Sequence, residues 1–183
     1  PSPTSFRVSR SDLVANVLGR FTEPLPVDAM RSTLNPLWTS QLRGVIESIT
    51  PTGDTARTIR LRCNHEFEAH RAGQFVTVGV DVDGVRHHRS YSVSSAPAPI
   101  GADRRARRTI EITVQGVVGG TVSTHLTSDA RVGDIVHLTP PAGEFVLPDT
   151  PPGKLLFITA GSGITPVMSM LRHLARLAPH PDR

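Results

Sequence analysis

With 183 residues, of which 38% are hydrophobic and 20% charged, the chain can bury a core and has the composition of a folded protein. Its net charge of +4 is too small to predict a nucleic-acid partner, and no aromatic residues are interleaved with the basic ones as in single-strand binders. No apolar run approaches the roughly 20 residues that cross a bilayer, and the first residues lack the basic-then-apolar pattern of a signal segment. We therefore expect neither a nucleic-acid site nor a transmembrane segment.

Cysteine usage points to a compartment. Cys63 is the only cysteine, so no internal disulfide can form, and a reducing cytoplasm is the expected location.

Residues 1–40 predict an N-terminal helical arm. Ser11 can cap a short helix that ends near Phe21, with an apolar stripe at helical spacing, and Pro24, Pro26 and Pro36 divide the rest into short pieces. This arm either packs against the main domain or is a docking helix for a partner or a membrane surface.

Residues 41–148 have the pattern of an antiparallel β domain. Asp83-Gly84 is a strong two-residue hairpin signal between two of the predicted strands. Short strands separated by tight turns predict a six-stranded barrel. The expected strands are Val45–Thr50, Ala56–Cys63, Gln74–Val82, Val85–Ser94, Thr109–Gln115 and Asp134–Thr139.

The arginine cluster Arg104–Arg108 is predicted to lie in a loop between two of these strands. It is either a solvated hairpin tip or a contact for an acidic partner or a cofactor phosphate. The adjacent pair His87-His88 lies on a predicted strand, so its rings point apart and no metal site is expected there.

The pattern changes after a proline-rich linker at 148–153. Leu155–Thr159 is a continuous apolar run, typical of a strand covered on both faces. A glycine turn follows, then a predicted helix over Thr165–Leu177, with Met168, Leu171, Leu174 and Leu177 facing inward. Residues 153–183 thus predict the first β-α unit of an α/β nucleotide-binding domain. One such unit leaves much apolar surface exposed, so we expect the chain to be a piece of a longer protein.

Three segments carry candidate chemistry. In Arg89-Ser90-Tyr91-Ser92, strand alternation places Arg89 and Tyr91 on one face, where a guanidinium can grip a diphosphate and an aromatic ring can lie against a flat ligand. The turns Gly119–Ser123 and Gly161–Pro166 each open a helix, where backbone amides favour anions. Taken singly, each segment has a purely structural explanation. Arg89 and Tyr91 could be a packed surface pair, and Gly119–Ser123 could be a turn with Ser123 as helix cap. Gly161–Pro166 could be a glycine turn that binds no ligand.

The order of these segments resembles the ferredoxin-reductase-type flavoprotein family, over about residues 42–177. The resemblance implies that Arg89 binds the diphosphate of FAD, that Tyr91 stacks on the flavin ring and that Ser92 lies near flavin N5. Tyr91 and Ser92 are then the residues nearest the chemistry. Further matches to the family are Gly73-Gln74-Phe75 and Pro141-Ala142-Gly143-Glu144-Phe145.

The resemblance implies two more groups of contacts. FAD is expected to contact Ser90 and Thr113 and, through its diphosphate, Gly120, Thr121, Val122 and Ser123. NAD(P)H is expected at Gly161, Gly163, Thr165 and Pro166. Two diphosphate contacts favour FAD over FMN, which has a single phosphate. Gln115 departs from the family, since many members have a basic residue at this position beside the cofactor.

The implied function is electron transfer from NAD(P)H through FAD to an iron–sulfur acceptor, as in reductase components of oxygenases. The arm ending in Asn35-Pro36-Leu37-Trp38 is similar to that of actinobacterial reductases thought to serve membrane lipid desaturases. A single cysteine cannot hold a 2Fe–2S cluster. The resemblance implies that the cluster lies in a downstream domain or on a partner. The chain alone is expected to be inactive with NAD(P)H. The alternatives are a flavin-binding electron-transfer or interaction module without NAD(P)H activity, and the reductase part of a flavohaemoglobin.

Overall fold

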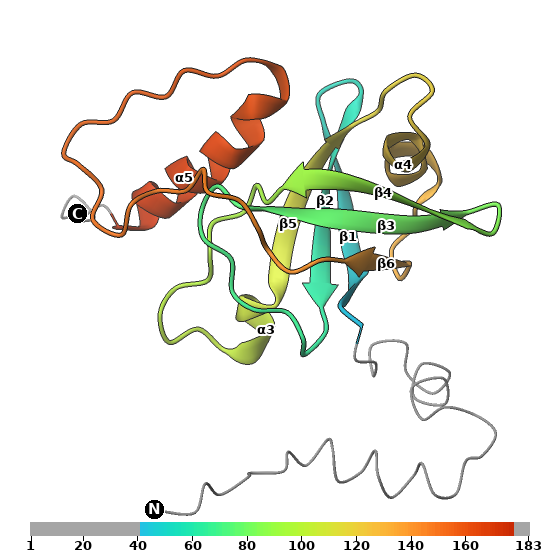
Figure 1. The fold of residues 1–183 in the computed structure, drawn as a ribbon, viewed down its shortest axis with the longest axis horizontal. Helices are drawn as coiled ribbons and strands as arrows, with labels where there is room; N and C mark the ends of the chain where they lie inside the picture. The colour runs from blue at the N-terminus through green and yellow to red at the C-terminus, as the bar shows by residue number, and fades with distance from the viewer. Residues whose placement is uncertain (1–40, 178–183) are drawn as a thin grey trace, which may run out of the picture. The chain divides into compact units, whose positions relative to one another are not determined.

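The structure is a computed structural model that describes residues 41–177 (Figure 1). The chain divides into two units at Ser40, and the fold below is that of the unit that begins at Gln41. The predicted arm over 1–40, with its helix from Ser11 to Phe21, lies outside the described residues, as do residues 178–183.

Six antiparallel strands form one sheet in the order β4-β3-β6-β1-β2-β5. The sheet curls until its two outer strands meet, where Val93 bridges Ile112 and the Ser94 amide donates to the Glu111 carbonyl at 2.7 Å. The predicted six-stranded barrel is confirmed, and each predicted strand end lies within two residues of the observed one. The strands are β1 (Arg43–Thr52), β2 (Ala56–Cys63), β3 (Phe75–Val82), β4 (Val85–Ser92), β5 (Thr109–Gln115) and β6 (Ile135–Leu138).

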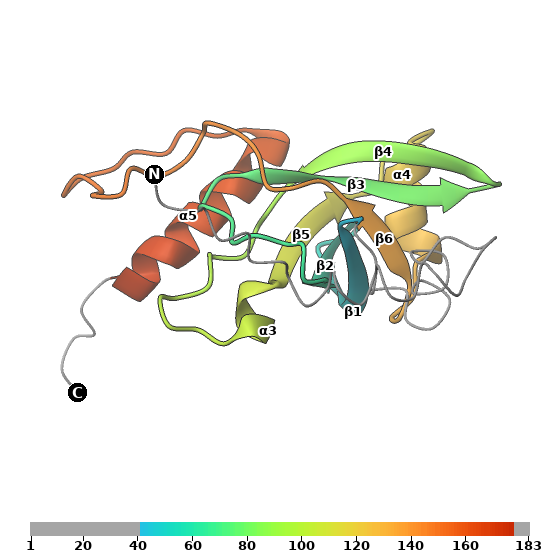
Figure 2. The same cartoon turned by 60° about the horizontal axis from the view of Figure 1, so that its bottom comes forward.

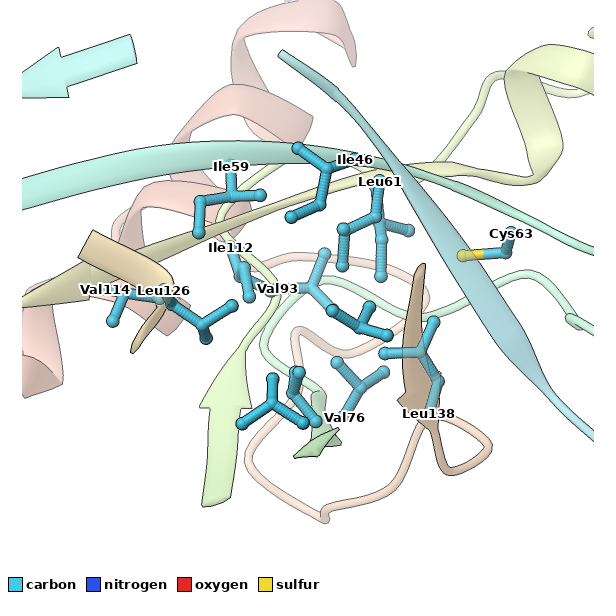
Figure 3. Packing of buried hydrophobic residues seen from close by; sticks show 14 of the residues in the cluster. Ile46, Ile59, Leu61, Cys63, Val76, Val93, Ile112, Val114, Leu126 and Leu138 are labelled. Carbon is cyan, nitrogen blue, oxygen red and sulfur yellow. The ribbon is translucent and has the colours of Figure 1, made fainter. Parts of the chain in front are cut away.

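Alternating side chains from β1, β2, β3, β5 and β6 fill the barrel, and the partly buried Tyr91 of β4 packs against them. Ile59 and Leu61 on β2 are fully buried, while Arg60 between them faces outward. Val76 on β3 and Ile112 on β5 pack into the same cluster (Figure 3). Each such burial contributes about 1.5–3 kcal/mol, so this core fixes which face of every strand points out.

The β3–β4 hairpin sets the register of the candidate site. Asp83 and Gly84 both have positive φ, at 51° and 76°, as a type I′ turn requires. This tight turn pairs Val78 with Arg89 and Val76 with Tyr91.

Four short or medium helical elements accompany the barrel: α3 (Arg104–Arg107), α4 (Thr121–Thr124) with its π-helical continuation His125–Asp129, the 3₁₀ turn Gly161–Gly163, and α5 (Ile164–Leu177). The arginine cluster predicted as a loop is therefore partly helical. The reason is local, because the Asp103 carboxylate accepts the Ala106 amide at 2.7 Å and caps the turn. None of the helices in the described part of the chain is long and apolar enough to cross a membrane.

The segment after the barrel differs from the prediction in two ways. Leu155–Thr159 is not a strand, and Leu156 and Ile158 are 83% and 89% exposed. A parallel strand needs a neighbouring strand to accept its hydrogen bonds, and the described residues place none beside it. On α5, Leu171 and Leu177 are exposed rather than inward. The helix instead buries Val167 and Met170, because it lies beside the barrel near the end of β4 (Figure 2).

Candidate functional site

A cavity of about 720 Å³ lies where the end of β4, the turn before α4 and the turn before α5 meet. These three segments are the ones that carry the candidate motifs. The cavity is lined by Thr52, Ala56, Arg89, Ser90, Tyr91, Ser92, Thr113, Gln115, Val117, Val118, Gly119, Gly120, Val122, Ser123, Gly161, Ser162, Ile164 and Thr165.

Arg89 and Tyr91 share one face of β4, as strand alternation predicts. They are paired with Val78 and Val76, which face the core, and so the two side chains extend the inner face of the barrel. The Arg89 guanidinium makes one hydrogen bond within the described residues, from Nη1 to the His88 carbonyl at 3.1 Å. Its remaining donors therefore stay available for an anion.

Tyr91 is half-buried and packs against the barrel core. Burial raises the pKa of its phenol, and the positive charge of Arg89 opposes this shift, so the hydroxyl is neutral at neutral pH. No described residue is hydrogen-bonded to the side chain of Tyr91 or of Ser92. The Ser90 hydroxyl, by contrast, pairs with Thr77 Oγ1 at 3.0 Å on the outer face, so Ser90 faces the cavity with its backbone.

The turn before α4 is built for close backbone approach. Gly119 has φ of 76°, and Gly120 precedes the helix without a side-chain cap. A Cβ on Gly120 would lie 2.5 Å from Ser123 Oγ, so a side chain at this position would displace the Ser123 hydroxyl. Ser123 is neither a cap nor free, because its hydroxyl donates to the Gly120 carbonyl at 3.2 Å and accepts the Val117 amide at 3.3 Å. The first amides of a helix have no carbonyl partner within the helix, and Gly120, Val122 and Ser123 of this turn line the cavity.

The turn before α5 contributes Gly161, Ser162 and Thr165 to the cavity. Gly161 has φ of 53°, and Thr165 Oγ1 donates to the Ser162 carbonyl at 2.6 Å, which fixes the start of the helix. Gly163 has a packing role, since a Cβ there would lie 2.8 Å from Thr159 Oγ1.

Helix α5 is attached to the loop that follows β4. Ser169, fully buried, donates from Oγ to the Ser95 carbonyl at 2.6 Å. Arg172 donates to the Ser94 carbonyl at 2.8 Å, and Arg176 donates to the Pro97 carbonyl at 2.8 Å. The turn at the start of α5 is thereby held in a fixed position relative to the end of β4.

Most predicted site residues surround this one cavity, while Thr121, Gly163 and Pro166 are not among its lining residues. Thr113 lines it, but its hydroxyl donates to Ser94 Oγ at 3.1 Å. Six cavity-lining residues were not predicted from the sequence: Thr52, Ala56, Val117, Val118, Ser162 and Ile164. The only sequence signal for Val117 and Val118 was their place directly before Gly119-Gly120, and their exposure is known only from the structure. Within residues 41–177, no three His, Cys, Asp or Glu side chains are grouped to hold a metal ion.

Comparison with known proteins agrees with this geometry. Residues 44–147 match the model of the family described as oxidoreductase FAD-binding domain. An NADPH oxidoreductase of Mycobacterium tuberculosis is 41% identical over 162 residues, which cover 87% of this chain and 42% of that protein. The NADH oxidoreductase HCR of Escherichia coli is 35% identical over 137 residues, covering 75% of this chain and 40% of that protein.

Among solved structures, phthalate dioxygenase reductase is 26% identical with a TM-score of 0.54, over 75% of this chain and 40% of that one. The chain thus spans about two fifths of the length of the curated relatives it matches. The barrel, the cavity and these matches together show that the chain belongs to the oxidoreductase FAD-binding domain family, of ferredoxin-reductase type.

Proposed function

We propose that the cavity binds FAD, and that the chain is the flavin-binding part of a reductase that passes electrons from NAD(P)H through FAD to an iron–sulfur acceptor. The acceptor would belong to an oxygenase or a desaturase. One observation carries the proposal: segments far apart in the sequence, around Arg89, Gly120 and Gly161, line a single cavity.

The residues present suit FAD. Arg89 has guanidinium N–H groups that bond to no described residue, and the first turn of α4 has no side-chain cap. Both can donate hydrogen bonds to the negatively charged oxygens of a diphosphate. The half-buried Tyr91 ring offers a flat apolar surface for an aromatic ring system. A volume of about 720 Å³ lies within the range of small-molecule sites.

When bound, FAD would supply the ability to accept a hydride and to release electrons one at a time. The residues of the protein would orient the flavin and the nicotinamide cofactor. Ser92 would offer a hydroxyl to the reacting edge of the flavin, and Tyr91 would hold the plane of the ring. Gly161 and Thr165 would hold the diphosphate of NAD(P)H, at a position that the contacts of α5 fix relative to β4.

We also propose a domain arrangement of an arm over 1–40, a flavin domain over 41–148 and the start of a nucleotide-binding domain over 153–183. The exposure of Leu156 and Ile158 supports the last part, because an unpaired apolar segment is expected to join a larger sheet. The name of phthalate dioxygenase reductase describes electron transfer from pyridine nucleotides to a 2Fe–2S centre, which supports an iron–sulfur protein or domain as partner.

Titration of the purified chain with FAD tests the flavin site. We expect saturable one-to-one binding, seen as a yellow protein that keeps its flavin absorbance through gel filtration. A colourless protein that ignores added FAD would overturn the proposal.

Anaerobic mixing of the FAD-bound chain with NADH or NADPH tests the donor site. We expect slow or no bleaching of the flavin absorbance by the chain alone, and rapid bleaching in a longer form that contains a complete nucleotide-binding domain. A longer form that binds FAD but is reduced by neither nucleotide would favour a flavin-binding electron-transfer module instead.

A further inference from the structure

A second cavity, of about 350 Å³, lies on the barrel away from the FAD cavity and contains three arginines. Arg60 comes from β2, and Arg172 and Arg176 come from the last turns of α5. The Gly161–Thr165 turn is at the other end of that helix, and at 1.5 Å per residue Arg176 lies roughly 17 Å from Thr165 along the axis. The two cavities share no lining residue.

The charges in this arginine pocket are not balanced. Glu111 is its only carboxylate, so three guanidiniums leave a net charge of +2. Glu111 accepts from Arg60 at 2.8 Å and from Arg172 at 3.4 Å, whereas Arg176 donates only to a backbone carbonyl, that of Pro97. Each of the three guanidiniums keeps nitrogen donors without a partner in the described part of the chain. Arg60 and Arg172 are about half exposed, so a ligand can reach them.

The rest of the lining is mixed in polarity. Ser95 and Thr109 are polar, whereas Ala96, Ala98 and Pro99 from the loop after β4 and Ala106 of α3 are small and apolar. Helix α3 carries three arginines next to Ala106 in the sequence. Arg105 pairs with Glu47 at 2.9 Å, and Arg104 and Arg107 add positive charge close to this part of the lining.

We propose that this arginine pocket binds a small organic phosphate, with the phosphate group on Arg60, Arg172 and Arg176 and the organic part against the alanine and proline wall. A phosphomonoester carries a charge of about −1.5 to −2 at neutral pH, which matches the unbalanced +2. A monocarboxylate, with a charge of −1, would neutralise only half of the net charge of the pocket. Paired donors of guanidinium groups fit the oxygens of a phosphate group. The site is separate from the FAD cavity and does not depend on the proposed function.

Calorimetric titration of the chain tests the pocket, with glycerol 3-phosphate, inorganic phosphate and acetate as probes and the FAD cavity saturated beforehand. We expect saturable binding of glycerol 3-phosphate that weakens as salt rises, weaker binding of inorganic phosphate because it lacks the organic part, and no binding of acetate. Acetate binding as tightly as glycerol 3-phosphate, or no saturable binding of either phosphate, would overturn the assignment.

Two variants locate the binding. Arg176→Gln removes a guanidinium that contacts only a backbone carbonyl, and it should weaken glycerol 3-phosphate binding about tenfold. Arg60→Gln, on a different element, should have a similar effect on phosphate binding. Arg131→Gln, an exposed arginine outside the pocket with the same change of charge, is the matched control and should bind as the parent chain does. Equal losses in Arg131→Gln and Arg176→Gln would show non-specific attraction and reject the site.

Discussion

At the scale of single residues, the candidate FAD site depends on which polar groups are still available. Arg89 retains donors, and no described residue bonds to the side chains of Tyr91 and Ser92. Ser90 and Thr113 line the same cavity, but their hydroxyls are bonded to Thr77 and Ser94. Residues of similar chemistry therefore differ in what they can offer a ligand.

Arg89→Ala is expected to weaken FAD binding roughly ten- to hundredfold, because charge-assisted hydrogen bonds contribute about 1.5–3 kcal/mol. Quenching of flavin fluorescence during titration measures this change. Arg86→Ala is the matched control on the same strand, since Arg86 faces away and pairs with Asp81 at 2.8 Å. Similar losses in both variants would mean that general charge, and not the position of Arg89, governs affinity.

Gly120→Ala is expected to reduce FAD affinity by roughly tenfold, because the turn before α4 loosens. Its Cβ would lie 2.5 Å from Ser123 Oγ and 3.1 Å from the Val117 carbonyl, so the Ser123 hydroxyl must give up its hydrogen bonds to Gly120 and Val117 and the backbone must shift slightly. The same titration serves as the measurement. Gly153→Ala, where an added Cβ meets nothing within 4 Å, should bind FAD normally. Unchanged affinity in Gly120→Ala would show that this turn does not contact the cofactor.

At the scale of elements, α5 joins the two halves of the site. Side chains from one side of the helix donate to the backbone of the loop that directly follows Ser92. Met170 is buried beside Ala72 and Leu147, so apolar packing supports the same contact. The proposed positions of nicotinamide and flavin are thus linked by side chains of α5 that bond to backbone carbonyls, one of them the buried Ser169.

Ser169→Ala is expected to destabilise this contact by about 1 kcal/mol, the usual net value of a buried hydrogen bond. Amides of α5 that exchange through local opening of the helix should then exchange roughly fivefold faster. Ser128→Ala, at an exposed serine in the π-helical turn, is the control and should leave α5 exchange unchanged. Unaltered exchange in Ser169→Ala would remove this hydrogen bond from the attachment of α5.

At the scale of the whole molecule, closure of the barrel buries the lone cysteine. Cys63 is 3% exposed, and burial raises the pKa of its thiol from 9.0 to about 12. The folded chain therefore keeps the thiol protonated where the unfolded chain ionises it. The contribution of Cys63 to stability is complete below pH 9 and falls as the pH rises from 9 towards 12.

The thiol should consequently report global unfolding. At pH 8 we expect almost no reaction of Cys63 with a thiol reagent in native conditions and complete reaction in denaturant. The rate across a urea series should follow the unfolding transition measured by circular dichroism. Rapid reaction of the native chain would show that the barrel opens locally around β2.

The strand prediction succeeded because its signals are local. The alternation of Ile59 and Leu61 with charged neighbours and the Asp83-Gly84 turn each depend on a few adjacent residues. The Leu155–Thr159 prediction failed because pairing is not local, since an apolar run becomes a strand only where another strand lies beside it. For the same reason, the arginines of β2 and α5 gave no sequence signal of a shared pocket.

The sequence by itself determined the barrel, the shared face of Arg89 and Tyr91 and the glycine turns, since side-chain alternation and backbone freedom follow from residue type and spacing. Only the tertiary structure decided that the segments at Arg89, Gly120 and Gly161 surround one cavity. It also decided that the hydroxyls of Ser90, Thr113 and Ser123 are bonded within the protein. The physical reason is that a hydrogen bond or a cavity wall depends on which distant groups packing brings within a few ångströms, and a one-dimensional pattern does not contain that distance.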